Sequence, residues 1–151
     1  MDRNEFAARV VAQTDRMYRI AWILLRHPED CRDAMQETAL RAWEKRATLR
    51  EEAYFATWLV RILINECRSI QRKRRRLVTL EEIAEPAVPP QDPALSIALQ
   101  RLPEQLRLPL TLHTLEGMSY EEVARTLRLP RSTIVGRIQR AKQQLKKELE
   151  V

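Results

Sequence analysis

The stretch "LRLPRSTIVGRIQRAKQQL", residues 127–145, contains the pattern that decides the fold of this chain. After a break at Pro130, apolar residues recur at steps of three and four, which is the period of an amphipathic helix. On a helical wheel one apolar face collects Ile134, Ile138, Ala141 and Leu145. We expect this face to pack on the preceding helix.

The outer face of the same helix carries hydroxyl, amide and guanidinium groups, with no acidic residue before Glu148. Its members are Ser132, Gly136, Gln139 and Gln143, flanked by Val135, Arg140 and Lys142. Such groups are the donors and acceptors that meet phosphates and base edges in a major groove, and the small Gly136 would let the backbone come close. A solvated amphipathic helix would show the same apolar stripe, but the uncharged and basic outer face favours DNA contact.

The preceding segment "SYEEVARTL", residues 119–127, strengthens this interpretation. Ser119 followed three residues later by Glu122 is a capping-box pattern at a helix start. A short helix, a tight turn and a second helix form the pattern of a helix-turn-helix.

The remainder of the chain is also expected to be helical. The whole sequence has two glycines and little alternation of β-branched residues. Pro28 suits the first turn of one helix, while Pro103 and Gly117 suit the two ends of another. The expected helices lie within 3–13, over about 14–26, from 27 onward, over about 51–74, from about 95, and within 102–117.

The segment "LVTLEEIAEPAVPPQDPA" at residues 77–94 follows the expected helix over about 51–74. It contains four prolines that no helix can accommodate: Pro86, Pro89, Pro90 and Pro93. The predicted fold is therefore all-α, with two small helical domains at 1–76 and 94–151 and an acidic, proline-rich linker at 77–93. The 16 residues 77–92 could extend over about 55 Å, or roughly 16 base pairs of DNA.

The charge pattern agrees with a nucleic-acid partner. The net charge is +6, and residues 1–80 contain 17 Lys and Arg against 11 Asp and Glu. Residues 81–98 contain 4 acidic and no basic residues, whereas 99–151 contain 10 basic and 6 acidic ones. With no long apolar run and no signal-peptide pattern, we expect a cytoplasmic protein without membrane insertion.

Catalysis and cofactors are not expected. Cys31 and Cys67 are far apart in the sequence and lack a CxxC spacing, so neither a disulfide framework nor a zinc motif is indicated. His27 and Cys31 could share a helix face, but no further metal ligand lies nearby. Nothing forms a nucleophile, phosphate loop or catalytic constellation, which predicts that the protein is not an enzyme and has no cofactor.

A second basic cluster, "RSIQRKRRR" at residues 68–76, ends the first predicted domain. Basic residues complement a helix C-terminus, but such a dense cluster also attracts a polyanion. Just upstream, "AYFATWLVRILINE" places three aromatic residues near Asn65. Aromatic rings can stack on unpaired bases and an asparagine can bond a base edge, although Trp22, Trp43 and Trp58 are first assigned to the core.

Together these residues resemble the extracytoplasmic-function (ECF) sigma factors, the small two-domain members of the bacterial primary sigma family. "DAMQETALRAW" at 33–43 is similar to the segment that docks on the clamp helices of the largest RNA polymerase subunit. "FATWLVRILINECRSIQRKRRR" at 55–76 is similar to the promoter-melting, −10-reading segment. Residues 102–145 resemble the −35-reading helix-turn-helix domain.

The residue patterns and the resemblance together imply three sets of contacts. The −35 set is Arg131, Ser132, Thr133, Val135, Gly136, Gln139, Arg140 and Lys142. The −10 set is Tyr54, Phe55, Trp58, Asn65, Arg68, Arg72 and Lys73. The polymerase-binding set is Asp33, Gln36 and Glu37.

Three departures from the family pattern concern these sets. Ser69 stands where the family often has an acidic residue, and Arg128 where many members have a turn glycine, which predicts a turn that does not require positive φ. Val135 and Gly136 replace a more usual basic residue and serine, so Gln139 and Arg140 are the expected −35 readers.

The resemblance implies core RNA polymerase as a partner, through the clamp helices and, for the C-terminal domain, the flap. It also implies promoter DNA, an anti-sigma factor that can be membrane-bound, and an acidic linker that threads the polymerase channels. The alternative is a stand-alone helix-turn-helix regulator that binds duplex DNA as a dimer. That alternative leaves "DAMQETALRAW" and "AYFATWLVRILINE" without a role.

Overall fold

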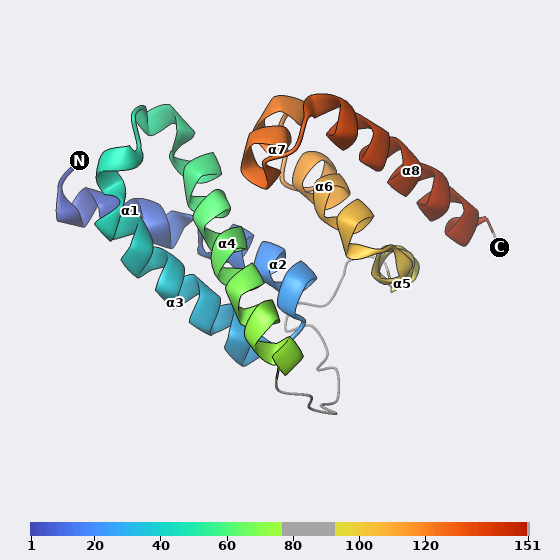
Figure 1. Ribbon diagram of the computed structural model, residues 1–151, viewed down its shortest axis with the longest axis horizontal. Helices are drawn as coiled ribbons and strands as arrows, with labels where there is room; N and C mark the ends of the chain where they lie inside the picture. Colours follow the sequence, from blue (N-terminus) through green and yellow to red (C-terminus); the bar gives the residue numbers. More distant parts are fainter. Residues whose placement is uncertain (77–92, 151) are drawn as a thin grey trace. The chain divides into compact units, whose positions relative to one another are not determined.

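A computed structural model describes residues 1–76 and 93–150 of the chain, and these residues form helices with no strand among them (Figure 1). The chain divides into two compact units, Met1–Pro86 and Ala87–Val151. The first contains α1 (Arg3–Ala12), α2 (Thr14–Leu25), α3 (Pro28–Glu44) and α4 (Phe55–Arg76). The second contains α5 (Pro93–Arg101), α6 (Glu104–Thr114), α7 (Tyr120–Leu127) and α8 (Arg131–Leu149).

Local sequence features stabilise the starts of two helices in the first unit, α1 and α3. The Asp2 side chain accepts a hydrogen bond from the Glu5 amide at 2.8 Å, which caps α1. Pro28 occupies the first turn of α3, as predicted, and His27 Nδ1 accepts from the Asp30 amide at 3.4 Å. Two short 3₁₀ turns, Arg46–Thr48 and Glu52–Tyr54, connect α3 to α4.

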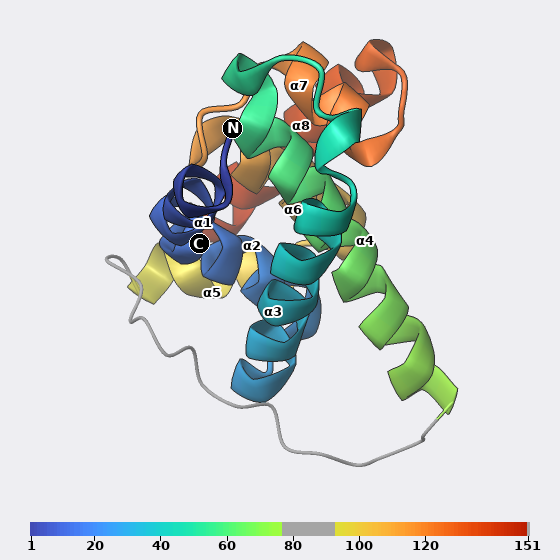
Figure 2. The ribbon, with the colours of Figure 1, turned by 90° about the vertical axis from the view of Figure 1, so that its left-hand side faces the viewer.

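The core of the first unit lies where α2, α3 and α4 pack on one another, and α3 and α4 run side by side in both ribbon views (Figures 1 and 2). Met17, Ile20, Leu59 and Leu63 are fully buried there. Thr38 is also buried, because its hydroxyl donates to the Ala34 carbonyl at 2.6 Å. The three predicted core tryptophans are half-buried.

An aromatic cluster closes one end of this core. Phe6 from α1 meets the rings of Trp43, Phe55 and Trp58 at centroid distances of 5.2, 5.7 and 6.4 Å, all near edge-to-face. Edge-to-face contacts of this kind favour one relative orientation of the rings. The cluster thereby ties α1 to the end of α3 and the start of α4.

The second unit packs α8 against α5, α6 and α7. Its core includes Leu108, Leu112, Val123, Ile134 and Ile138. Buried Arg107 supports the end of α5, because its guanidinium donates to the carbonyls of Gln100 and Leu102 at 3.2 and 3.4 Å.

The predicted linker was to include Pro93, but α5 begins at this residue, since a helix accepts proline at its first position. The other linker residues, 77–92, and the expected threading of the polymerase channels lie outside the described residues. Gly117 follows the end of α6 with φ of 73°, which agrees with its predicted role in closing that helix.

The prediction for Arg128 was wrong. This residue caps the end of α7 with φ of 57° and ψ of 45°, so the turn does require the left-handed conformation. The Leu129 amide donates to the Ala124 carbonyl at 3.0 Å, and the Arg128 amide donates to the same oxygen. These bonds satisfy the last turn of the helix only when Arg128 is left-handed, whatever its side chain.

Candidate nucleic-acid interface

The helix-turn-helix begins with the predicted capping box. The Glu122 amide donates to Ser119 Oγ at 3.1 Å, and the Ser119 amide donates to Glu122 Oε1 at 3.2 Å. Both bonds satisfy amides that the first turn of α7 would otherwise leave unpaired. The turn that follows ends at Pro130, which directly precedes α8.

Three of the four apolar residues predicted to hold α8 are buried. Ile134, Ile138 and Ala141 are at most 1% exposed, and Leu145 is half-buried. They pack not on α7 alone but on α5 and α6 as well. This packing fixes which side of α8 faces solvent.

The predicted −35 set lies on the opposite side of α8 and along its flanks, with Arg131 in the first turn. Among its members Arg131, Ser132, Gln139, Arg140 and Lys142 are exposed, whereas Thr133, Val135 and Gly136 are half-buried. Since α8 contains no acidic residue before Glu148, the accessible side chains along most of this helix are neutral or cationic. Such a surface is suited to the phosphates and base edges of a DNA duplex.

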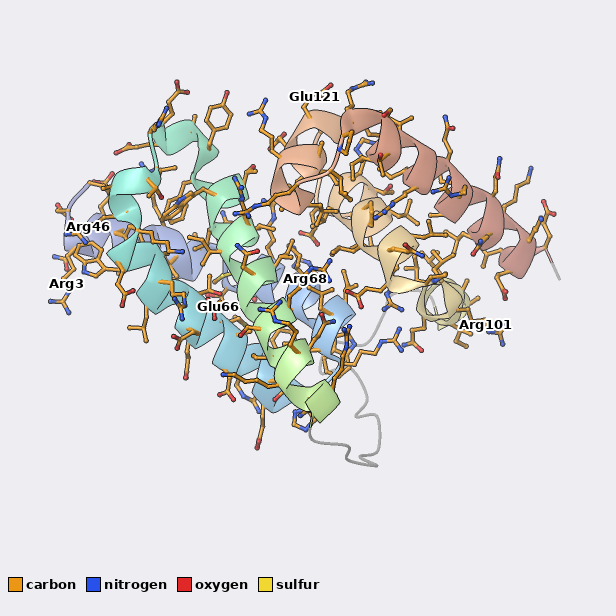
Figure 3. The ribbon with its side chains drawn as sticks, viewed as in Figure 1. Arg3, Arg46, Glu66, Arg68, Arg101 and Glu121 are labelled. Atoms are coloured by element: carbon orange, nitrogen blue, oxygen red, sulfur yellow. The ribbon has the colours of Figure 1, made fainter. Side chains whose placement is uncertain are left out.

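Arg131 already has partners within the chain. Its Nε donates to Glu121 Oε1 at 2.7 Å, and its guanidinium carbon lies 5.4 Å from the centroid of the Tyr120 ring. The hydrogen bond from Arg131 holds the pKa of Glu121 below its ordinary value. Figure 3 shows Glu121 at the start of α7, where it can orient Arg131.

In the first unit, α4 presents a cationic surface. Asn65, Arg68, Arg72 and Lys73 are exposed, and the first three lie at helical steps of three and four residues. Glu66 lies on the opposite side, facing α3, where its carboxylate is 2.6 Å from Arg41 Nε (Figure 3). The α4 side that carries Asn65 and Arg68 is therefore free of that carboxylate.

The three aromatic residues predicted for the −10 set have different surroundings. Tyr54 is 48% exposed, but Phe55 is 5% exposed within the aromatic cluster. We therefore remove Phe55 from the candidate DNA contacts, because the ring cannot stack on a base without leaving the core. Trp58 is half-buried, and its indole donates to Thr48 Oγ1 at 3.0 Å.

The predicted polymerase-binding residues share one exposed side of α3. Asp33, Gln36 and Glu37 are all exposed and lie at helical steps of three and four. The next position on that side is Leu40, which is 62% exposed and was not predicted as a contact. A helical wheel of residues 33–43 would have identified it as an apolar residue on a polar face.

Two other residues were missed. Arg61 lies one turn before Asn65 on α4, and Arg137 lies one turn after Thr133 on α8. Both are half-buried, so each exposes part of its side chain beside a predicted contact. Their spacing was the available signal, because residues four apart share a helix face.

No structural feature among residues 1–76 and 93–150 indicates a metal site, since no three His, Cys, Asp or Glu residues gather there. Cys31 is completely buried, and burial raises the pKa of its thiol to about 11. The thiol is therefore protonated at neutral pH. None of the described helices is long and apolar enough to cross a bilayer.

Comparison with known families gives two matches in order along the chain. Residues 10–77 match Sigma-70 region 2, and residues 94–145 match Sigma-70 region 4. The first match covers the whole of α2, α3 and α4, including the cationic surface of α4. The second covers the helix-turn-helix and α8 as far as Leu145.

Similar curated proteins have related descriptions. The "ECF RNA polymerase sigma-E factor" of Haemophilus influenzae is 30% identical over 155 aligned positions, covering 87% of this chain and 82% of that protein. The "ECF RNA polymerase sigma factor SigE" of Mycolicibacterium smegmatis is 33% identical over 147 positions, covering 87% of this chain. The matched region spans 56% of the length of that second relative.

Solved structures show the same fold. The sigma factor RpoE of Bartonella quintana, in complex with the anti-sigma factor NepR, superposes with a TM-score of 0.83 and 26% identity. That comparison covers 97% of this chain and 98% of the other. CnrH, solved with the cytosolic domain of CnrY, has a TM-score of 0.72 at 22% identity, covers 99% of this chain and 90% of that one, and shows the fold alone.

Proposed function

The chain belongs to the ECF sigma factors of bacterial RNA polymerase, and from this premise we propose which surface performs each step of promoter recognition. Sigma factors are not enzymes; they direct a polymerase to promoters. The order of the two Sigma-70 matches, region 2 at 10–77 and region 4 at 94–145, carries the proposal. It supports the division that we propose: an N-terminal domain at 1–76, a linker at 77–93 and a C-terminal domain at 94–151.

In the C-terminal unit, α8 enters the major groove of the −35 element. Gln139 and Arg140 read base edges, because both are exposed and carry side chains that can form two hydrogen bonds with one base. Ser132, Lys142 and Arg131 contact the phosphates. Arg131 still has its Nη donors for a phosphate after Nε is bonded to Glu121.

In the N-terminal unit, α4 contacts the −10 element. Asn65 bonds an unpaired base, and Arg68, Arg72 and Lys73 follow the backbone of the separated strand. Tyr54, at the exposed end of the connection before α4, supplies a ring on which a base can stack. Trp58 supports this end of α4 through its bond to Thr48.

Polymerase binds along α3. Asp33, Gln36 and Glu37 meet polar groups of the clamp helices, and Leu40 adds an apolar contact beside them. The C-terminal unit meets the flap. An anti-sigma factor is a further partner, because the structurally similar RpoE was solved in complex with the anti-sigma factor NepR. We place the protein in the cytoplasm, where RNA polymerase works.

Reconstituted transcription tests this proposal. The chain is mixed with core RNA polymerase and fragments of its host's DNA, and transcripts are compared with those made by core polymerase alone. We expect new transcripts that disappear when either component is omitted. Unchanged transcripts, with no association between the chain and core polymerase, would refute the proposal.

The alternative of a stand-alone helix-turn-helix regulator explains only the region 4 match. It leaves the region 2 match at 10–77 and the exposed side of α3 without a role. A gel-shift titration without polymerase separates the two functions. Tight, sequence-specific binding of duplex DNA by the chain alone would favour the regulator.

A further inference from the structure

The centre of the exposed face of α8 has no side chain. On a wheel of about 100° per residue, Gly136 lies almost opposite the buried Ile134, Ile138 and Ala141. Exposed polar residues surround this position at helical steps of three, four and seven: Ser132, Gln139, Arg140 and Gln143. We call this place the Gly136 gap.

No described residue of the chain requires glycine at position 136. Gly136 lies inside α8 and is not among the described residues with positive φ. Among residues 1–76 and 93–150, a Cβ atom added to it would come near Arg140 Nη1 alone, at 3.8 Å, which is an ordinary contact with the end of a flexible side chain. Because glycine in a helix interior is less favourable than alanine, its presence points to a close neighbour outside the chain.

The chemistry of the gap restricts that neighbour. The residue has no side-chain donor or acceptor, and its backbone groups lie within the hydrogen-bonded ladder of α8. Val135, the preceding residue, is apolar too. A base edge with amino or carbonyl groups would lose water at the gap and find no partner on Gly136 itself, which is unfavourable. The nearest side-chain group, Arg140 Nη1, is a donor that in this proposal serves the neighbouring base edge. A methyl group makes no hydrogen bonds to water, so it loses none when it enters the gap.

We propose that the Gly136 gap receives the C5-methyl group of a thymine in the −35 element. Among the groups that base pairs present in the major groove, this methyl is the apolar one. Gln139 and Arg140, beside the gap, bond the neighbouring base edges while the methyl fixes their register. The inference rests on the proposed function, since it assumes that α8 reads the −35 element.

Removing single methyl groups from the DNA tests the assignment. The holoenzyme, formed from the full chain and core polymerase, first selects promoter duplexes. In these duplexes each −35 thymine is then replaced in turn by deoxyuridine. We expect one or two replacements to weaken binding about threefold to fourfold, the loss expected for one buried methyl group. The other replacements should leave affinity unchanged.

Two variants connect the methyl effect to the gap. Gly136→Ser fills the gap, so we expect it to bind the thymine and deoxyuridine duplexes equally. Arg140→Ala is the matched control on the same face: we expect it to weaken binding to both duplexes while their affinity ratio stays at the wild-type value. Circular dichroism of each variant verifies that α8 remains helical.

The outcomes separate this inference from the proposed function. Selective binding that depends on Arg140, together with equal affinity for every deoxyuridine duplex, would overturn the methyl assignment and leave −35 reading intact. A deoxyuridine effect that persists in Gly136→Ser, or a selected −35 element without A·T pairs, would also overturn it. Failure of the holoenzyme to select any sequence would instead contradict the proposed function.

Discussion

At the scale of single residues, the helix-turn-helix depends on a few local devices. Ser119 and Glu122 satisfy the first amides of α7, and left-handed Arg128 allows the last turn to close. Glu121 and the Tyr120 ring hold Arg131 at the first position of α8. Each device orients the start of the helix that we expect to enter the groove.

Replacing Arg128 with glycine should stabilise the C-terminal unit. The left-handed conformation costs a non-glycine residue about 1–2 kcal/mol, and the greater freedom of glycine in the unfolded chain offsets about 0.4–1 kcal/mol of the gain. We therefore expect a net increase of about 0.5–1 kcal/mol, measured by hydrogen exchange of the α7 amides. Arg125→Gly, inside α7, is the control and should have the opposite effect. Equal destabilisation by both variants would contradict the role of Arg128.

The bond between Arg131 and Glu121 predicts a titration. A carboxylate whose pKa is depressed in the folded state contributes stability above its ordinary pKa and loses it as pH falls through the folded value. We expect NMR to find the Glu121 pKa below 4.5, and to find it higher in Arg131→Ala. The same Glu121 pKa in both proteins would show that Glu121 does not orient Arg131 through this contact.

At the scale of elements, α3, α4 and α8 each bury one side and present another. The buried sides were predictable because helical periodicity is local, as the buried Ile134, Ile138 and Ala141 show. Phe55 falls on the same apolar side of its helix as Leu59 and Ile62, yet it was also assigned to the −10 contacts. Its ring packs on Phe6 of α1, a long-range contact that periodicity does not reveal. The left-handed Arg128 was also missed, since a side chain that disfavours a conformation does not prevent it.

The cationic side of α4 should contribute to the salt dependence of promoter binding. The logarithm of the affinity falls linearly with the logarithm of the salt concentration. Each phosphate contact that is lost makes this slope less steep by about 0.7–0.9. We expect Arg72→Ala and Lys73→Ala each to reduce the slope of holoenzyme binding by nearly one. Arg3→Ala, on exposed α1, removes the same charge and should leave the slope unchanged. Equal slopes for all three variants would exclude α4 from phosphate contact.

The exposed side of α3 predicts a binding defect without a folding defect. Leu40 is 62% exposed, so Leu40→Asp should leave thermal stability within about 0.5 kcal/mol of the wild type. We expect it to weaken association with core polymerase at least tenfold, because a charge would enter an apolar contact. Val11→Asp is the control, since Val11 is 70% exposed on α1. Equal polymerase affinity for Leu40→Asp and the wild type would remove α3 from that interface.

At the scale of the whole molecule, the chain has two helical units, and each one matches a different Sigma-70 region. We propose polymerase and −10 contacts for the unit that matches region 2, and −35 contacts for the unit that matches region 4. The two-unit plan could be predicted because four prolines lie together between helical patterns. A helical wheel of residues 33–43 already places Leu40 on the polar side of α3, and the packing of α3 gives the extent of its exposure, 62%.

Sequencing the 5′ ends of transcripts tests the central claim most directly. The holoenzyme transcribes fragments of the host's DNA, and the sequences upstream of every new start are aligned. We predict two shared elements at a constant separation, with the upstream one lost from the alignment when Arg140→Ala replaces the wild-type chain. Start sites that match those of core polymerase alone, with no shared upstream element, would contradict the account.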